Sequence, residues 1–105
     1  MTENELFKIL KKIGIPVAYR EFSKGTQPPF AVYFRKDNDE TFADDIAYHS
    51  AENIQLELYT PKVRNLSLEK KVDTLLTENE IAFSVSDEIY LKDENMVEII
   101  YEFFI

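Results

Sequence analysis

The strongest constraint on this chain is a strict alternation of polar and apolar residues in its middle. Polar and apolar positions follow one another without a break, in the order Asn53, Ile54, Gln55, Leu56, Glu57 and Leu58. A period of two is typical of a β-strand, because successive side chains of a strand point to opposite faces of the sheet. The pattern therefore predicts a strand with one buried and one wet face, which begins at about Ile46 and ends at Pro61.

Two other stretches have the spacing of amphipathic helices. Residues 2–13 form the first, where Thr2 and Glu5 have the form of a capping box and Gly14 can end the helix in a left-handed conformation. The second follows Asn65 or Ser67 as its N-cap and runs to about residue 79. Their apolar stripes are Leu6, Leu10 and Ile13 in the first helix, and Leu68, Val72, Leu75 and Leu76 in the second. Each helix is therefore expected to cover a sheet.

The remaining strand-like segments are 17–22, 30–35, 81–85, 89–91 and 97–105. The first two are most simply two antiparallel strands, and residues 86–88 form a turn or bulge. The last segment is apolar on both faces near its end, which predicts that it is sandwiched or paired with a partner. Together the elements predict one α+β domain over residues 1–105, in the order α-β-β-β-α-β-β, with a mostly antiparallel sheet covered by two helices.

Composition excludes several classes of protein. Twenty Asp and Glu against 12 Lys and Arg leave a net charge of −8, which disfavours tight binding of nucleic acid. Cysteine is absent, so thiol catalysis, disulfides and zinc ribbons are excluded. With glycine only at positions 14 and 25, neither phosphate-binding glycine motif can be written. The acidic start does not resemble a signal peptide, and no apolar run reaches the roughly 18 residues of a membrane span.

Reactive constellations are equally scarce. His49 and Ser50 are neighbours, but adjacent residues of a strand point to opposite faces, which argues against a catalytic triad. Asp37 and Asp39 have the first spacing of a calcium-binding loop, yet Phe42 stands where such a loop needs glycine. We therefore predict no catalysis, no cofactor and no metal.

The segment Lys36–Asp45 is rich in acids and predicts a solvated loop. Phe42 is its one large apolar residue. It either packs under its own loop or contacts a partner, in which case the loop is ordered on assembly. The candidate residues for a subunit or partner interface are Asp37, Asp39, Glu40, Phe42, Asp44, Asp45, Phe103 and Phe104.

Four motifs run along the chain: Gly14-Ile15-Pro16-Val17-Ala18-Tyr19 with Phe22, Pro28-Pro29-Phe30-Ala31-Val32-Tyr33, Phe42-Ala43-Asp44-Asp45 with Tyr48, and Leu56-Glu57-Leu58-Tyr59-Thr60. In these motifs the sequence resembles the small tail-completion proteins of long-tailed phages and of prophages in Gram-positive bacteria. The resemblance covers nearly the whole chain. Its motifs consist of packing and turn residues and contain no reactive group.

The resemblance implies a structural protein similar to tail terminators, which cap the tail tube as a ring, commonly of six subunits, and contribute to the head–tail joining interface. The implied partners are phage tail-tube and head-connector proteins, and the implied locations are the virion tail and the host cytoplasm during assembly. We expect a monomer when the protein is isolated, with DNA passing through an acidic ring without tight binding. The alternative is an acidic bacterial adaptor or inhibitor that presents a negative surface to a basic protein partner.

Overall fold

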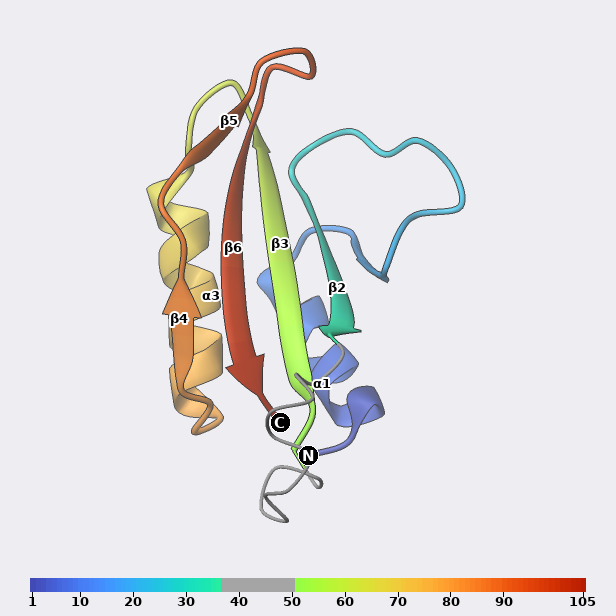
Figure 1. Cartoon of the computed structure of the whole chain (residues 1–105), viewed down its shortest axis with the longest axis vertical. Coiled ribbons are helices and arrows are strands. Elements are labelled where there is room, and N and C mark those ends of the chain that lie inside the picture. The colour runs from blue at the N-terminus through green and yellow to red at the C-terminus, as the bar shows by residue number, and fades with distance from the viewer. Residues whose placement is uncertain (37–50) are drawn as a thin grey trace.

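The computed structural model describes residues 1–36 and 51–105. Its elements are α1 (Glu3–Leu10), the 3₁₀ turn η1 (Lys11–Ile13), β1 (Val17–Tyr19), β2 (Phe30–Lys36), β3 (Asn53–Pro61), α3 (Leu66–Glu78), β4 (Phe83–Val85), β5 (Ile89–Leu91) and β6 (Met96–Phe104). The six strands form one mostly antiparallel sheet in the order β1-β2-β3-β6-β4, and β5 pairs with β6 as well (Figure 1). The predicted α+β fold and its element order are confirmed.

The first helix begins and ends where its local sequence predicts. The Thr2 hydroxyl accepts a hydrogen bond from the Glu5 backbone N–H at 3.2 Å, and the Thr2 N–H donates to Glu5 Oε1 at 3.1 Å. This capping box satisfies N–H groups that have no partner inside the helix. After α1, the 3₁₀ turn tightens the last residues, and Gly14 ends it at φ 90° in the left-handed region.

In the second helix, α3, the structure decides between the two possible caps. The Asn65 side chain accepts from the Leu68 N–H at 3.0 Å, so Asn65 is the N-cap and Ser67 lies inside the helix. Val72 and Leu76 are fully buried in the core. The local sequence had left this choice open because both residues are good caps at nearly the same position.

The alternating strand lies in the centre of the sheet as β3. Its residues Ile54, Leu56 and Leu58 are at most 1% exposed, which confirms the buried face. Antiparallel β2 and β6 flank it, with Leu56 opposite Tyr33 and Tyr101. The earlier start predicted at Ile46 lies outside the described residues.

The prediction that β1 and β2 are antiparallel is wrong. They pair in parallel, with Val17 opposite Ala31 and Tyr19 opposite Tyr33. Arg20, at φ 68°, turns the chain out of the strand after only three residues, and segment 21–29 returns it to the end of the sheet where β1 began. Parallel pairing requires such a crossover, whereas a hairpin would need only a short turn.

β6 has partners from its own chain on both sides. β3 pairs along one side, while β4 and β5 pair along the other and are separated at Ser86. There the Ser86 N–H donates to the Ile100 carbonyl at 2.8 Å, and the Ile100 N–H donates to Ser86 Oγ at 2.9 Å. The serine thus supplies both ladder bonds where the strand is interrupted, at the predicted turn or bulge.

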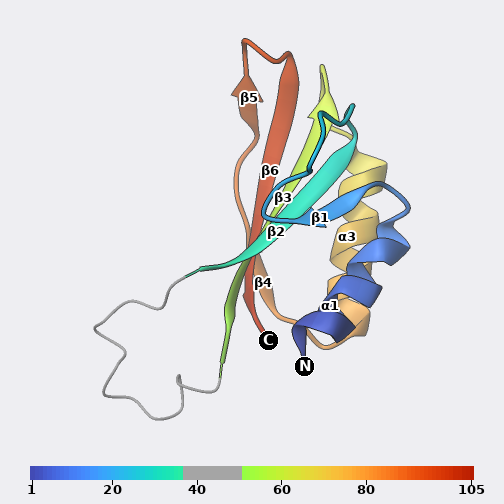
Figure 2. The ribbon, with the colours of Figure 1, turned by 90° about the vertical axis from the view of Figure 1, so that its right-hand side faces the viewer.

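Both helices cover the same face of the sheet (Figure 2). α1 lies toward β2, where the Phe7 and Tyr33 rings are 6.3 Å apart, and α3 lies toward β6, where the Tyr101 hydroxyl donates to the Glu69 carbonyl at 3.5 Å. The core between the helices and the sheet includes Leu6, Leu10, Leu56, Leu76, Ile99 and Phe103. In the described ranges no helix has both the length and the apolar character to cross a membrane.

Candidate functional site

The face of the sheet opposite the helices is the candidate site, and we call it the open face. Within residues 1–36 and 51–105, no helix lies over it (Figure 2). The strand register assigns to this face Phe30, Val32, Phe34 and Lys36 of β2, Asn53, Gln55, Glu57 and Tyr59 of β3, and Met96, Glu98, Ile100, Glu102 and Phe104 of β6. Most of these side chains are half-buried by their neighbours, so the face is neither a core nor an ordinary wet surface.

A shallow groove of about 440 Å³ lies at the end of the open face near the start of β2. The Phe30 ring stacks on Tyr59 at 4.9 Å, and Phe22 meets Phe30 edge to face at 5.6 Å. The connection between β1 and β2 contributes Arg20 and Lys24 to the lining of the groove, which also includes Leu91 and Met96. The groove is therefore lined by both aromatic and charged side chains.

Two carboxylates meet one phenol beside this groove. Tyr59 lies opposite Glu98 across the β3–β6 pair, and its hydroxyl is 2.8 Å from Glu98 Oε2 and 3.1 Å from Glu57 Oε1. Gln55 Nε2 donates to the other oxygen of Glu57 at 2.9 Å. Four polar side chains on two strands are thus joined in one continuous chain of contacts.

Burial controls the ionisation of this group. Loss of hydration raises the pKa of Tyr59, and its contacts with the two carboxylates raise it further. Burial also raises the pKa of Glu98, as does the negative charge of Glu57, while the hydrogen bond from Tyr59 acts in the opposite direction. Tyr59 is consequently neutral at physiological pH, and Glu98 holds a proton more tightly than an exposed glutamate.

The far end of the open face carries an ordinary ion pair. Lys36 Nζ donates to Glu102 Oε1 at 3.1 Å, and Asn53 Nδ2 donates to the same oxygen at 3.3 Å. The hydrogen bond from Lys36 holds the pKa of Glu102 below its usual value. Glu98 and Glu102 stand on the same strand and the same face, yet their surroundings shift their pKa values in opposite directions.

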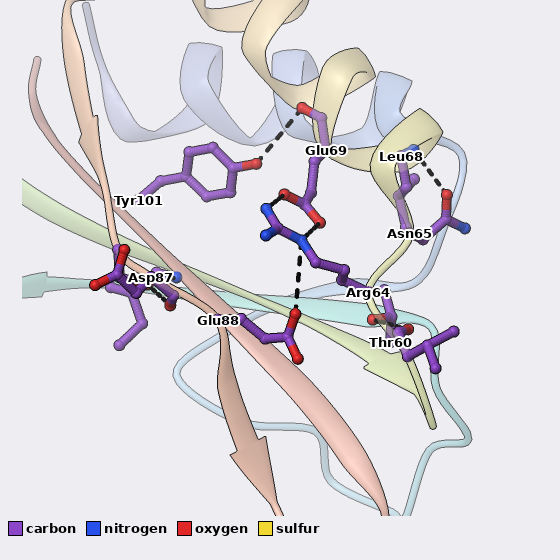
Figure 3. A network of polar contacts seen from close by, with 11 residues as sticks. Thr60, Arg64, Asn65, Leu68, Glu69, Asp87, Glu88 and Tyr101 are labelled. Atoms are coloured by element: carbon purple, nitrogen blue, oxygen red, sulfur yellow. Dashed lines mark hydrogen bonds and ion pairs between the residues drawn. The ribbon is translucent and has the colours of Figure 1, made fainter.

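A second polar network lies on the helix side of the sheet. Figure 3 shows the Arg64 guanidinium between Glu69 of α3 and Glu88, which precedes β5. Its contacts with the Glu69 carboxylate are 2.7 and 3.2 Å long, and Glu88 Oε1 is 3.9 Å away. The hydrogen bonds to Glu69 raise the pKa of Arg64. This arrangement neutralises a buried carboxylate and links the start of α3 to the β4–β5 connection, so we assign it a structural role.

The predicted interface residues are placed only in part. Asp37, Asp39, Glu40, Phe42, Asp44 and Asp45 lie outside the described residues, as do His49 and Ser50. Phe103 is 2% exposed on the helix-covered face, which makes it a core residue of the monomer, whereas Phe104 is 50% exposed on the open face. Of this pair, only Phe104 is accessible to a partner. In the part of the chain that is described, no group of three or more His, Asp or Glu is arranged to hold a metal ion.

Glu57 and Glu98 were not among the site residues predicted from the sequence. Among twenty acids, neither residue is marked by its local sequence, because the pairing of β3 with β6 brings them together from positions far apart in the chain. One signal was present in the strand itself, since Gln55, Glu57 and Tyr59 occupy the same face of an alternating strand. Three successive residues of one strand face that can all form hydrogen bonds can make a network along that face.

No family model matches the chain, and no curated protein shows a significant match to it.

Proposed function

We propose that this protein is a structural component of a phage tail, which completes or caps the tail tube and takes part in head–tail joining. The proposal combines the resemblance in the sequence with one structural observation, the open face. A half-apolar sheet face without a covering helix is suited to contact with another subunit, because such contact buries apolar surface that water otherwise touches.

The described residues that carry the resemblance hold the fold together. Gly14 ends the first helical segment, Val17 and Tyr19 pair with β2, and the motif around Leu56 forms the centre of the sheet. These are the positions that a family of structural proteins would share, because they determine backbone conformation and packing. Their roles agree with a protein that acts through its shape.

Charge supports the same assignment. The chain has a net charge of −8. A ring built from such subunits would repel the phosphates of DNA that moves through it, whereas a basic wall would bind them. The proposed partners are tail-tube and head-connector proteins, and the proposed assembly is a ring that forms on the tail.

Deletion of the gene from the phage or prophage that carries it tests the proposal. Electron microscopy of tails from the deletion strain should show tubes that lack a defined end and do not join heads. Complementation with the wild-type gene should restore joining. Normal virions in the deletion strain would refute the proposal.

The alternative is an acidic adaptor or inhibitor, which the negative charge also favours. It predicts a stable one-to-one complex with a basic protein, whose affinity falls steeply with salt. The neighbouring genes separate the two functions. Portal, capsid and tail-tube genes support the tail protein, and a gene for a basic toxin supports the inhibitor.

A further inference from the structure

The Tyr59 hydroxyl contacts two hydrogen-bond acceptors but has only one proton to donate. Its hydroxyl is within hydrogen-bond distance of Glu57 Oε1 and of Glu98 Oε2, at 3.1 and 2.8 Å. A phenol carries a single proton, and an ionised carboxylate only accepts hydrogen bonds. If both glutamates were ionised, the two carboxylates would have to share the single phenol proton, or one contact would join an oxygen lone pair to a negative oxygen. Two full hydrogen bonds form when one glutamate carries a proton and donates it to the phenol oxygen.

The surroundings indicate that Glu98 carries this proton. Gln55 Nε2 donates to Glu57 at 2.9 Å, so the Glu57 carboxylate has a hydrogen-bond donor besides Tyr59. Glu98 receives no such donor apart from Tyr59 among the described residues, and it stands between Met96 and Ile100 along β6. Its neighbours across the strands are Tyr59 and Ile89. Apolar neighbours exclude water from the carboxyl group and offer it no hydrogen bonds, so the neutral acid is favoured here.

Other charged groups lie farther along the same face. Besides Glu57, the groove beside Tyr59 is lined by Arg20 and Lys24 and by Glu21 and Glu94, two cations and two further anions. On the opposite side, Glu102 is already paired with Lys36 at 3.1 Å. Within the described residues, the groups that act on Glu98 are therefore Tyr59, by its hydrogen bond, and Glu57, directly by its charge and by a side-chain hydrogen bond.

We propose that Glu98, Tyr59 and Glu57 form a pH-sensitive proton switch beside the groove of the open face. In the protonated state, Glu98 donates to the Tyr59 oxygen, Tyr59 donates to Glu57, and the side chains of β3 and β6 are joined. On deprotonation the proton passes to water, Tyr59 retains its own proton and donates to only one carboxylate, and the face gains one negative charge. The switch is a property of the isolated chain and does not depend on the proposed tail function.

The sign of the effect on stability follows from proton linkage. The folded chain binds the Glu98 proton more tightly than the unfolded chain does, because the pKa is raised from its usual value of 4.5. The stabilisation is complete below that usual value, and it is lost as pH rises from there through the raised pKa. Glu102 has a lowered pKa and produces the opposite slope on the acid side of the same value.

A carbon NMR titration of the side-chain carboxyl groups tests the switch directly. One glutamate should titrate above the others, its signal should be absent in Glu98→Gln, and its pKa should fall in Glu57→Gln, which removes the neighbouring negative charge. Glutamine has nearly the shape of glutamate and does not ionise in this range. Glu102→Gln, on the same strand and face, is the matched control and should leave the Glu98 titration unchanged.

Urea unfolding at a series of pH values provides the second measurement. Wild type should lose stability relative to Glu98→Gln as pH rises above about 4.5, and Glu102→Gln should not remove that loss. The proposal is overturned if Glu98 titrates at or below the usual glutamate value, or if Glu57→Gln leaves its pKa unchanged. Because both measurements use the isolated protein, their outcome is independent of whether tails require it.

Discussion

Truncation of Leu56 to alanine should cost the fold about 2–5 kcal/mol. The side chain is 0% exposed, at the centre of β3, between Tyr33 of β2 and Tyr101 of β6. The change removes three carbon groups, worth about 0.8 kcal/mol each in lost apolar transfer, or about 2.4 kcal/mol together. The remaining cost, up to the upper end of the range, comes from the cavity that the truncation leaves. The neighbouring residues cannot move to fill it, because strand pairing holds them in place.

Leu66→Ala provides a matched control, because it removes the same atoms from a different environment. Leu66 is the first residue of α3 and is 66% exposed. Alanine is a good helix former, and little apolar contact is lost. The free energy of unfolding should therefore change by less than about 0.5 kcal/mol.

Urea unfolding followed by far-ultraviolet circular dichroism measures both variants. Leu56→Ala should lower the urea midpoint with an unchanged m-value, while Leu66→Ala should have the same midpoint as wild type. Equal midpoints would refute the assigned register of β3, because a shift by one residue exchanges its two faces. Leu56→Asp extends the test and should leave no folded state, whereas Glu57→Lys on the open face should remain folded.

Three further predictions concern single side chains. Arg64→Met should lower the urea midpoint, because Glu69 is only 8% exposed and its carboxylate would lose its bidentate partner. An unchanged midpoint would show that water can solvate the Glu69 carboxylate when the arginine is absent. Lys36→Met should raise the pKa of Glu102 in an NMR titration, since the hydrogen bond that lowers it is lost. The stability difference between this variant and wild type should be largest above the usual glutamate pKa and vanish as pH falls through the lowered value. Phe42→Ser should leave urea stability within about 0.5 kcal/mol of wild type and abolish tail completion in vitro; a stability loss of about 1–3 kcal/mol would instead indicate local packing of Phe42.

Sequence alone determined the elements of this fold whose causes are local. The capping box of Thr2 and Glu5, the stop at Gly14 and the alternation from Asn53 to Leu58 all depend on residues close together in the chain. Their hydrogen bonds and side-chain directions are nearly complete within one turn or one strand. For that reason both helices, the central strand and the interruption at Ser86 could be predicted before any pairing was known.

Only the tertiary structure decided which strands are neighbours and which residues meet. The parallel pairing of β1 with β2 depends on the path of the crossover, and the central place of β6 buries Phe103 while Phe104 remains exposed. The contact of Tyr59 with Glu98 joins positions 39 residues apart. The pairing of distant strands depends on how all the apolar faces of the chain pack together, so it cannot be predicted from any local pattern. The open face and its proton switch therefore arise from the assembled sheet, although every side chain in them was visible in the sequence.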